Sequence, residues 1–112
     1  MTIKLPLPQE KKLTMIFRVE AGCLGPEGAR HIDDFCAKVQ KEFIGIDADF
    51  IHWEITPRHD KSLPEMQYQI NNKTLSKDQA KTYLSLFGKT LHEFEEHLNQ
   101  KIGLAIDQYM GY

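Results

Sequence analysis

The last third of the chain has the pattern of a long amphipathic helix, and this pattern constrains the fold more than any other. Ser76-Lys77-Asp78-Gln79 fits a capping box, in which a serine and a glutamine side chain satisfy free backbone groups at a helix start. From there apolar side chains recur every three or four positions, at Ala80, Leu84, Phe87, Leu91, Phe94, Leu98, Ile102, Ala105, Tyr109 and Tyr112. This spacing predicts one helix over residues 76–110.

Such a helix is longer than a small domain needs, since its residues would span about 50 Å at 1.5 Å each. Gly88 and Gly103 are the expected places for a bend, because glycine inside a helix costs about 1 kcal/mol relative to alanine. Beyond Lys101 the apolar surface spreads around the helix, which predicts burial on several sides. Either a second copy or the extended N-terminal segment, with Ile3, Leu5 and Leu7, would cover this surface. We expect a homodimer whose interface includes Ile102, Ala105, Ile106, Tyr109 and Met110.

The first two thirds of the chain predict three strands and one further helix. Residues 13–20, 50–56 and 66–71 alternate apolar and polar side chains, as half-buried strands do, and residues 73–75 add a short extended piece. A helix is expected to begin near Pro26 and to bury one stripe, formed by Ile32, Phe35, Cys36, Val39 and Phe43. Pro6 and Pro8 keep residues 1–12 extended.

The resulting order, β-α-β-β-α, predicts a single α+β domain over residues 1–112. We expect a two-layer sandwich in which a small three-stranded sheet carries both helices on one face and the long C-terminal helix overhangs it. The first two strands flank a helix and should be parallel. The second and third strands should form a hairpin.

Composition excludes several classes of protein. The net charge of −2 argues against a general nucleic-acid binder, and no apolar run approaches the length of a membrane span. Two cysteines are too few for a disulfide scaffold, and two prolines interrupt the N-terminus where a signal peptide needs an apolar stretch. The sequence thus predicts a cytoplasmic protein without a cofactor. Glu93 and His97 share a helix face, but on their own they cannot fill a metal coordination shell, so we predict no metal site.

One loop cluster is a candidate ligand site. If the first two strands are parallel, residues 22–28 and 57–65 meet at one edge of the sheet, beside a helix N-terminus. Basic side chains there suit a carboxylate or phosphate, a thiol near the helix dipole can ionise, and a histidine can act as a base. The cluster comprises Cys23, Arg58, His59, Asp60 and Lys61.

The alternative interpretation of this cluster is a solvated loop beside a tight strand-to-helix turn, because residues 22–28 match neither a P-loop nor a dinucleotide fingerprint. Two hypotheses on function therefore stay open. The first is a non-enzymatic, homodimeric interaction or scaffolding module. The second is a small anion- or metabolite-binding protein or enzyme that uses the loop cluster.

Overall fold

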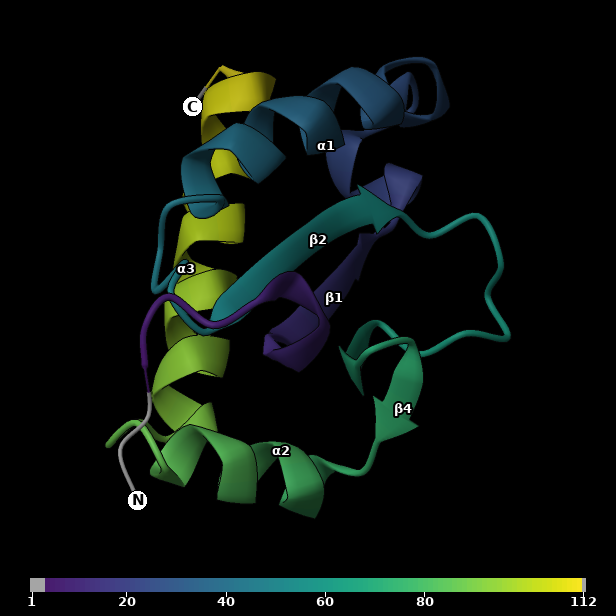
Figure 1. The fold of residues 1–112 in the computed structure, drawn as a ribbon. Coiled ribbons are helices and arrows are strands. Elements are labelled where there is room, and N and C mark those ends of the chain that lie inside the picture. Colours follow the sequence, from purple (N-terminus) through teal and green to yellow (C-terminus); the bar gives the residue numbers. More distant parts are fainter. Residues whose placement is uncertain (1–3, 112) are drawn as a thin grey trace.

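A computed structural model describes residues 4–111 of the chain and shows an α+β architecture in which helices pack on a four-stranded sheet (Figure 1). The strands are β1 (Leu13–Val19), β2 (Ile51–Pro57), β3 (Met66–Ile70) and β4 (Lys73–Leu75). The α-helices are α1 (Gly28–Phe43), α2 (Lys77–Ser85) and α3 (Leu91–Met110). Two short 3-10 turns are η1 (Gln9–Lys11) and η2 (Ala21–Leu24). The predicted fold class is confirmed.

The strand order is β2-β1-β3-β4. β1 and β2 are parallel, as predicted, and run in register from the Leu13–Ile51 pair to the Val19–Pro57 pair. The predicted hairpin between β2 and β3 is wrong, because β3 pairs antiparallel with β1 instead. Alternation of side chains assigns a strand to a face of the sheet, but it does not say which strand lies next to it.

The outer edge of β2 is closed by a side chain rather than by a strand. The Gln40 amide of α1 donates from Nε2 to the Trp53 carbonyl (2.6 Å) and accepts at Oε1 from the Ile55 N–H (2.7 Å). Pro57, at the end of the strand, has no N–H to offer. Gln40 thus bonds two backbone groups at this edge, and β3 pairs on the other side of β1.

The sheet has four strands rather than the predicted three, since residues 73–75 form a ladder with β3. Asn71 (φ 50°) and Asn72 (φ 67°) form the two-residue turn between β3 and β4. Asparagine tolerates positive φ, and two such residues suit the type I′ turn whose twist matches a hairpin. The predicted turn at this position is confirmed.

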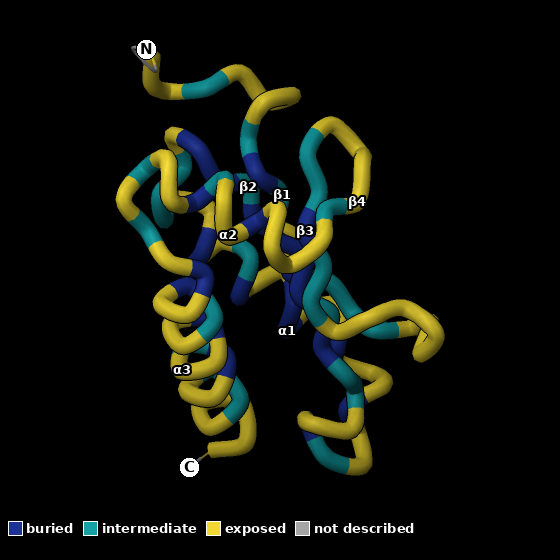
Figure 2. The backbone as a smooth tube through the Cα atoms, turned by 90° about the horizontal axis from the view of Figure 1, so that it is seen from below, coloured by how far each residue is buried: buried dark blue, intermediate teal, exposed yellow. Residues whose placement is uncertain are grey.

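The core lies between the sheet and the helices, as the buried segments in Figure 2 show. The predicted apolar stripe of α1 is buried, although the helix begins at Gly28 rather than near Pro26. At the centre, Trp53 is 1 % exposed and its ring lies 5.1 Å from that of Phe43 and 6.0 Å from that of Phe94. The opposite face of the sheet is largely polar, with Thr14, Arg18, His52, Glu54, Gln67 and Gln69.

The prediction of one helix over residues 76–110 is wrong, because the chain breaks at Gly88 and forms α2 and α3. Gly88 has φ +71°, its N–H donates to Ser85 O (3.1 Å), and the Lys89 N–H donates to Leu84 O (3.1 Å). This pattern is a Schellman motif, which ends a helix at a left-handed glycine. The expected bend at Gly103 does not occur, since Gly103 lies inside α3.

A new cap starts the next helix directly. The Thr90 hydroxyl accepts a hydrogen bond from the Glu93 N–H (3.2 Å), so α3 can leave in a different direction from α2. The predicted capping box at Ser76 is confirmed for α2. Figure 1 shows the consequence: α2 lies at one end of the molecule, and α3 runs from there to α1 at the other end.

The segment before β1 is tied down at two points. The Leu7 N–H donates to Asp49 O (2.8 Å), and the Tyr83 hydroxyl of α2 contacts Lys11 O, Leu13 N and Phe50 O. The prediction of an extended segment over residues 1–12 is corrected at Gln9–Lys11, which form η1, and its first three residues lie outside the described range. None of the helices formed by residues 4–111 combines the length and apolar character that a membrane span requires.

Candidate functional site

Three regions of the surface are candidate functional sites: the predicted loop cluster, a groove beside β3, and the C-terminal end of α3. The loop cluster is partly assembled. His59 Nε2 lies 3.9 Å from Asp33 Oδ1 of α1, and both side chains are exposed. The loop after β2 therefore lies beside the first turns of α1, as the parallel pairing implied.

Arg58, the residue expected to bind an anion, is engaged by its own chain. Its Nη1 donates to Glu20 Oε1 (2.6 Å), and its Nε and Nη2 donate to Leu63 O (3.2 and 3.0 Å). These contacts neutralise the guanidinium and brace the loop. Anion binding by this cluster stays a prediction, and the geometry favours a structural role for Arg58.

The other loop residues are either hydrogen-bonded within the loop or exposed to solvent. Asp60 Oδ1 accepts from the Ser62 hydroxyl (2.6 Å) and from the Ser62 N–H (2.9 Å), and these hydrogen bonds lower the pKa of the Asp60 carboxyl. Lys61 is exposed. The four cavities described for residues 4–111 are lined by other side chains, so the cluster does not border any of them.

The two thiols lie in different environments. Cys23 is exposed in η2, whereas Cys36 is 2 % exposed on the buried stripe of α1. Burial, with a smaller contribution from Asp33, raises the pKa of the Cys36 thiol to about 11. Since the thiolate is the reactive species, Cys36 is both shielded and protonated at neutral pH.

We expect one thiol per native chain to react with Ellman's reagent at pH 8, and two after denaturation in guanidinium chloride. Cys23→Ser should abolish the native signal, and Cys36→Ala should leave it unchanged. Two fast thiols in the native protein would contradict the burial of Cys36.

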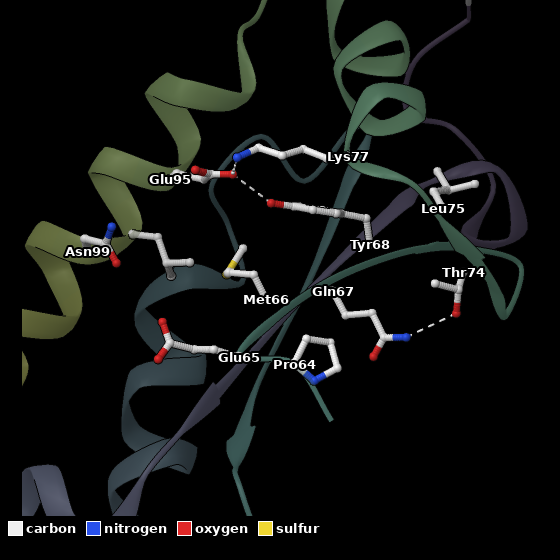
Figure 3. Close-up of a pocket in the computed structure, with 11 residues that line it drawn as sticks. Pro64, Glu65, Met66, Gln67, Tyr68, Thr74, Leu75, Lys77, Glu95 and Asn99 are labelled. Atoms are coloured by element: carbon white, nitrogen blue, oxygen red, sulfur yellow. Dashed lines mark hydrogen bonds and ion pairs between the residues drawn. The ribbon is translucent and has the colours of Figure 1, made fainter. Parts of the chain in front are cut away.

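A groove of about 500 Å³ opens between α3 and the β3–β4 part of the sheet (Figure 3). Its walls come from the loop before β3, from β3 and β4, from the first residue of α2 and from the first half of α3. The lining residues are Pro64, Glu65, Met66, Gln67, Tyr68, Thr74, Leu75, Lys77, Glu95, Leu98 and Asn99. The groove combines an apolar floor with charged and amide-bearing rims.

The end of the groove near α2 is fixed by a three-residue contact. The Tyr68 hydroxyl donates to Glu95 Oε1 (2.8 Å), and Lys77 Nζ lies 3.6 Å from the same oxygen (Figure 3). The capping box places Lys77 here, as the first residue of α2. Burial and the adjacent Glu95 carboxylate raise the pKa of Tyr68, so its hydroxyl is a hydrogen-bond donor rather than a base at neutral pH.

The opposite wall is braced from the polar face of the sheet. Arg18 donates from Nη1 to Pro64 O and from Nη2 to Gln67 Oε1, both at 2.7 Å. Gln67 Nε2 in turn donates to Thr74 Oγ1 at 3.1 Å. These bonds hold the start of β3 and the loop before it, so the groove is built on rigid elements.

Sequence reasoning missed this groove. Its residues come from distant parts of the chain, and the predicted single helix over residues 76–110 lacked the change of direction at Gly88 that precedes α3. One signal was available: the capping box at Ser76 follows the three-residue strand Lys73–Leu75 directly, whereas the neighbouring strand Met66–Ile70 has five residues. A short edge strand beside a longer one leaves part of the longer strand's edge open.

The predicted interface residues at the C-terminal end of α3 differ in how far they are buried. Ile102 is buried in the core, and Ala105 and Ile106 are half-buried. Tyr109 packs edge-on against Phe35 of α1, at 6.0 Å between ring centroids, yet stays 39 % exposed. The α1 helix therefore supplies part of the cover that we expected from a second copy.

The exposed side chains at this end of α3 are nevertheless apolar. Leu104 is 63 % exposed and Met110 is 37 % exposed. Met110 also reaches the η2 turn, where a Cβ on Gly25 would lie 3.3 Å from its Cε atom.

Comparison with known proteins gives no direct guide to these regions, since no protein-family model, curated protein or solved structure matches the chain. Within residues 4–111, no group of three or more His, Cys, Asp or Glu side chains is arranged to hold a metal ion.

Proposed function

We propose that this protein is a cytoplasmic, non-enzymatic interaction module that acts as a homodimer, with the C-terminal half of α3 at the interface. One observation carries the proposal: of seven exposed large apolar side chains within residues 4–111, three lie within seven residues of this helix, at Leu104, Tyr109 and Met110. Clustered apolar surface is costly to leave in water and is typical of protein contacts.

The arrangement also suits self-association. A two-fold dimer brings the same patch of each copy together, so the apolar C-terminal end of α3 can bury itself against its own image. Half-buried Ala105 and Ile106 border the exposed side chains and would extend the apolar contact. Ile102 would support the interface from the core rather than contact the partner, because only 6 % of it is exposed.

Multi-angle light scattering at micromolar concentration tests the proposal. We expect the wild-type protein to show twice the chain mass of 13.0 kDa, and Leu104→Glu to show the mass of one chain. Burying an unpaired carboxylate in an apolar contact costs several kcal/mol, which is enough to dissociate a dimer of moderate affinity. Leu104 is a better probe than Met110, because Met110 also packs within its own chain.

Leu86→Glu is the matched control. Leu86 is also 63 % exposed but lies at the end of α2, away from the proposed interface. The control variant should keep the wild-type mass. A wild-type protein that is monomeric at these concentrations, or two variants with equal effects, would refute the proposed interface.

A further inference from the structure

The groove beside β3 contains an unpaired stretch of sheet edge. The β3–β4 ladder begins at the Ile70–Lys73 pair and ends at the Tyr68–Leu75 pair, because the chain then turns into α2. On its other side, β3 continues to pair with β1 through Met66. Two residues of β3, Met66 and Gln67, therefore extend beyond the last pair with β4.

The register determines which backbone groups face this gap. The Arg18 N–H donates to Glu65 O (2.8 Å), so Glu65 and, by alternation, Gln67 direct their backbone groups toward β1. Met66 then directs its N–H and C=O to the β4 side, where β4 has already ended. A pairing site for one residue of an added strand is left open at Met66.

The cavity lies across this edge of the sheet. Tyr68 and Leu75 line it from the face that carries the helices, whereas Gln67 and Thr74 line it from the opposite face. Residues from both faces can border one cavity only where the sheet ends between them. The groove of about 500 Å³ thus offers room beside the free backbone groups of Met66.

The charge of the groove indicates what it would accept. Glu65 and Glu95 both border it, and the Lys77 ammonium forms its ion pair with Glu95, at 3.6 Å. None of the ion pairs formed within residues 4–111 involves Glu65. Figure 3 shows the Glu65 and Glu95 carboxylates with the Asn99 amide along the same side of the cavity. Among the lining residues two carboxylates accompany one ammonium group, and this acidic excess favours a basic partner. Arg18 does not line the groove, since its guanidinium donates to Pro64 O and Gln67 Oε1 from the polar face of the sheet.

We propose that this groove binds an extended basic peptide segment of a partner protein, which adds a short strand beside Met66. The added residue exchanges backbone hydrogen bonds with Met66, and its side chain enters the groove on the face that carries α3. There a lysine or arginine meets the Glu65 and Glu95 carboxylates and the Asn99 amide. Backbone pairing supplies affinity and the acidic rim supplies specificity, as in other cases of strand addition.

The other edge of the sheet does not compete for such a peptide, because Gln40 already bonds Trp53 O and Ile55 N of β2. The proposal is also independent of the homodimer. Its residues lie at the first half of α3 and the β4–α2 corner, whereas the proposed dimer contact lies at residues 104–110.

The experiment selects phage-displayed random heptapeptides on the immobilised full chain and then measures the best synthetic peptide by fluorescence anisotropy. We expect enrichment of one lysine or arginine flanked by β-branched residues, which favour strands. Met66→Pro removes the N–H at the open edge without removing a bond to β1, and it should weaken binding roughly tenfold or more. Met66→Ala, the matched control, keeps the N–H and should retain binding.

Charge is tested at Glu65. Glu65→Lys should weaken binding of the selected basic peptide by roughly fivefold, as expected for the loss of an exposed ion pair. Amide shifts in ¹⁵N spectra of the wild-type chain should concentrate at residues 65–67, 75–77 and 95–99, a result that does not depend on any variant folding.

Four results would overturn the proposal: no enriched peptide, enrichment of acidic peptides, equal binding by Met66→Pro and Met66→Ala, or amide shifts confined to other surfaces. A monomeric wild-type protein would refute only the homodimer and would not affect the interpretation of the peptide-binding measurement.

Discussion

Trp53→Ala is expected to lower the free energy of unfolding by about 3–5 kcal/mol, the range for truncating a large buried aromatic side chain. Trp53 is 1 % exposed, and its ring lies against Phe43 and Phe94, so the truncation removes contacts to α1 and α3 together. Its Nε1 also donates to Ile46 O (2.9 Å), which would lose its partner. Urea unfolding followed by circular dichroism measures the change, since the variant has no tryptophan fluorescence.

Trp53→Phe separates packing from hydrogen bonding. Phenylalanine keeps most of the aromatic contact but cannot donate to Ile46 O, so we expect a smaller loss of roughly 1–3 kcal/mol. A loss below about 1 kcal/mol for Trp53→Ala would contradict the placement of this side chain between the sheet and both long helices.

Gly28→Ala is expected to destabilise the protein by about 3 kcal/mol, the upper part of the range for an overpacked site. A Cβ at Gly28 would overlap the carbonyl oxygen of Ala21 and would lie 3.1 Å from the Leu24 Cβ. Both neighbours belong to η2, whose last turn leads into α1, so backbone must move to make room. Thermal and urea unfolding of the variant measure the loss.

Gly103→Ala is the matched substitution, and it is expected to change the stability in the opposite direction. Gly103 lies inside α3, and nothing lies within 4 Å of the position that its Cβ would take. Alanine there should stabilise the protein by about 0.5–1 kcal/mol, because glycine loses more backbone freedom on folding. If the two substitutions changed the free energy of unfolding in the same direction, the result would contradict the local geometry of the η2–α1 junction.

Local structure could be predicted from the sequence wherever one short pattern of residues determined it. The capping box at Ser76, the Asn71-Asn72 turn and the apolar stripe of α1 all follow from side chains within a few residues of one another. The parallel pairing of β1 and β2 followed from the helix between them. These features rest on local hydrogen bonds and on periodicity, which a sequence displays directly.

The break at Gly88 was also present in the sequence, but it was outweighed by the apolar period that continues across it. Gly88 followed by Thr90-Leu91-His92-Glu93 combines a helix-ending glycine with a second capping pattern. The positive φ of Gly88 and the Thr90 hydroxyl bond together redirect the chain. A continuous apolar stripe therefore did not establish a continuous helix.

The neighbours of each strand and the candidate sites were decided by the tertiary structure. The sequence by itself determined the α+β class, the faces of the strands and helices, and most of their ends, because these depend on residues close together in the chain. Three contacts depend on tertiary packing: Gln40 bonds the edge of β2, and β3 pairs with β1 rather than with β2. In the third, Arg58 donates a hydrogen bond to Glu20. The groove exists for the same reason, since Met66 and Glu95 are brought together by long-range contacts that no local pattern records.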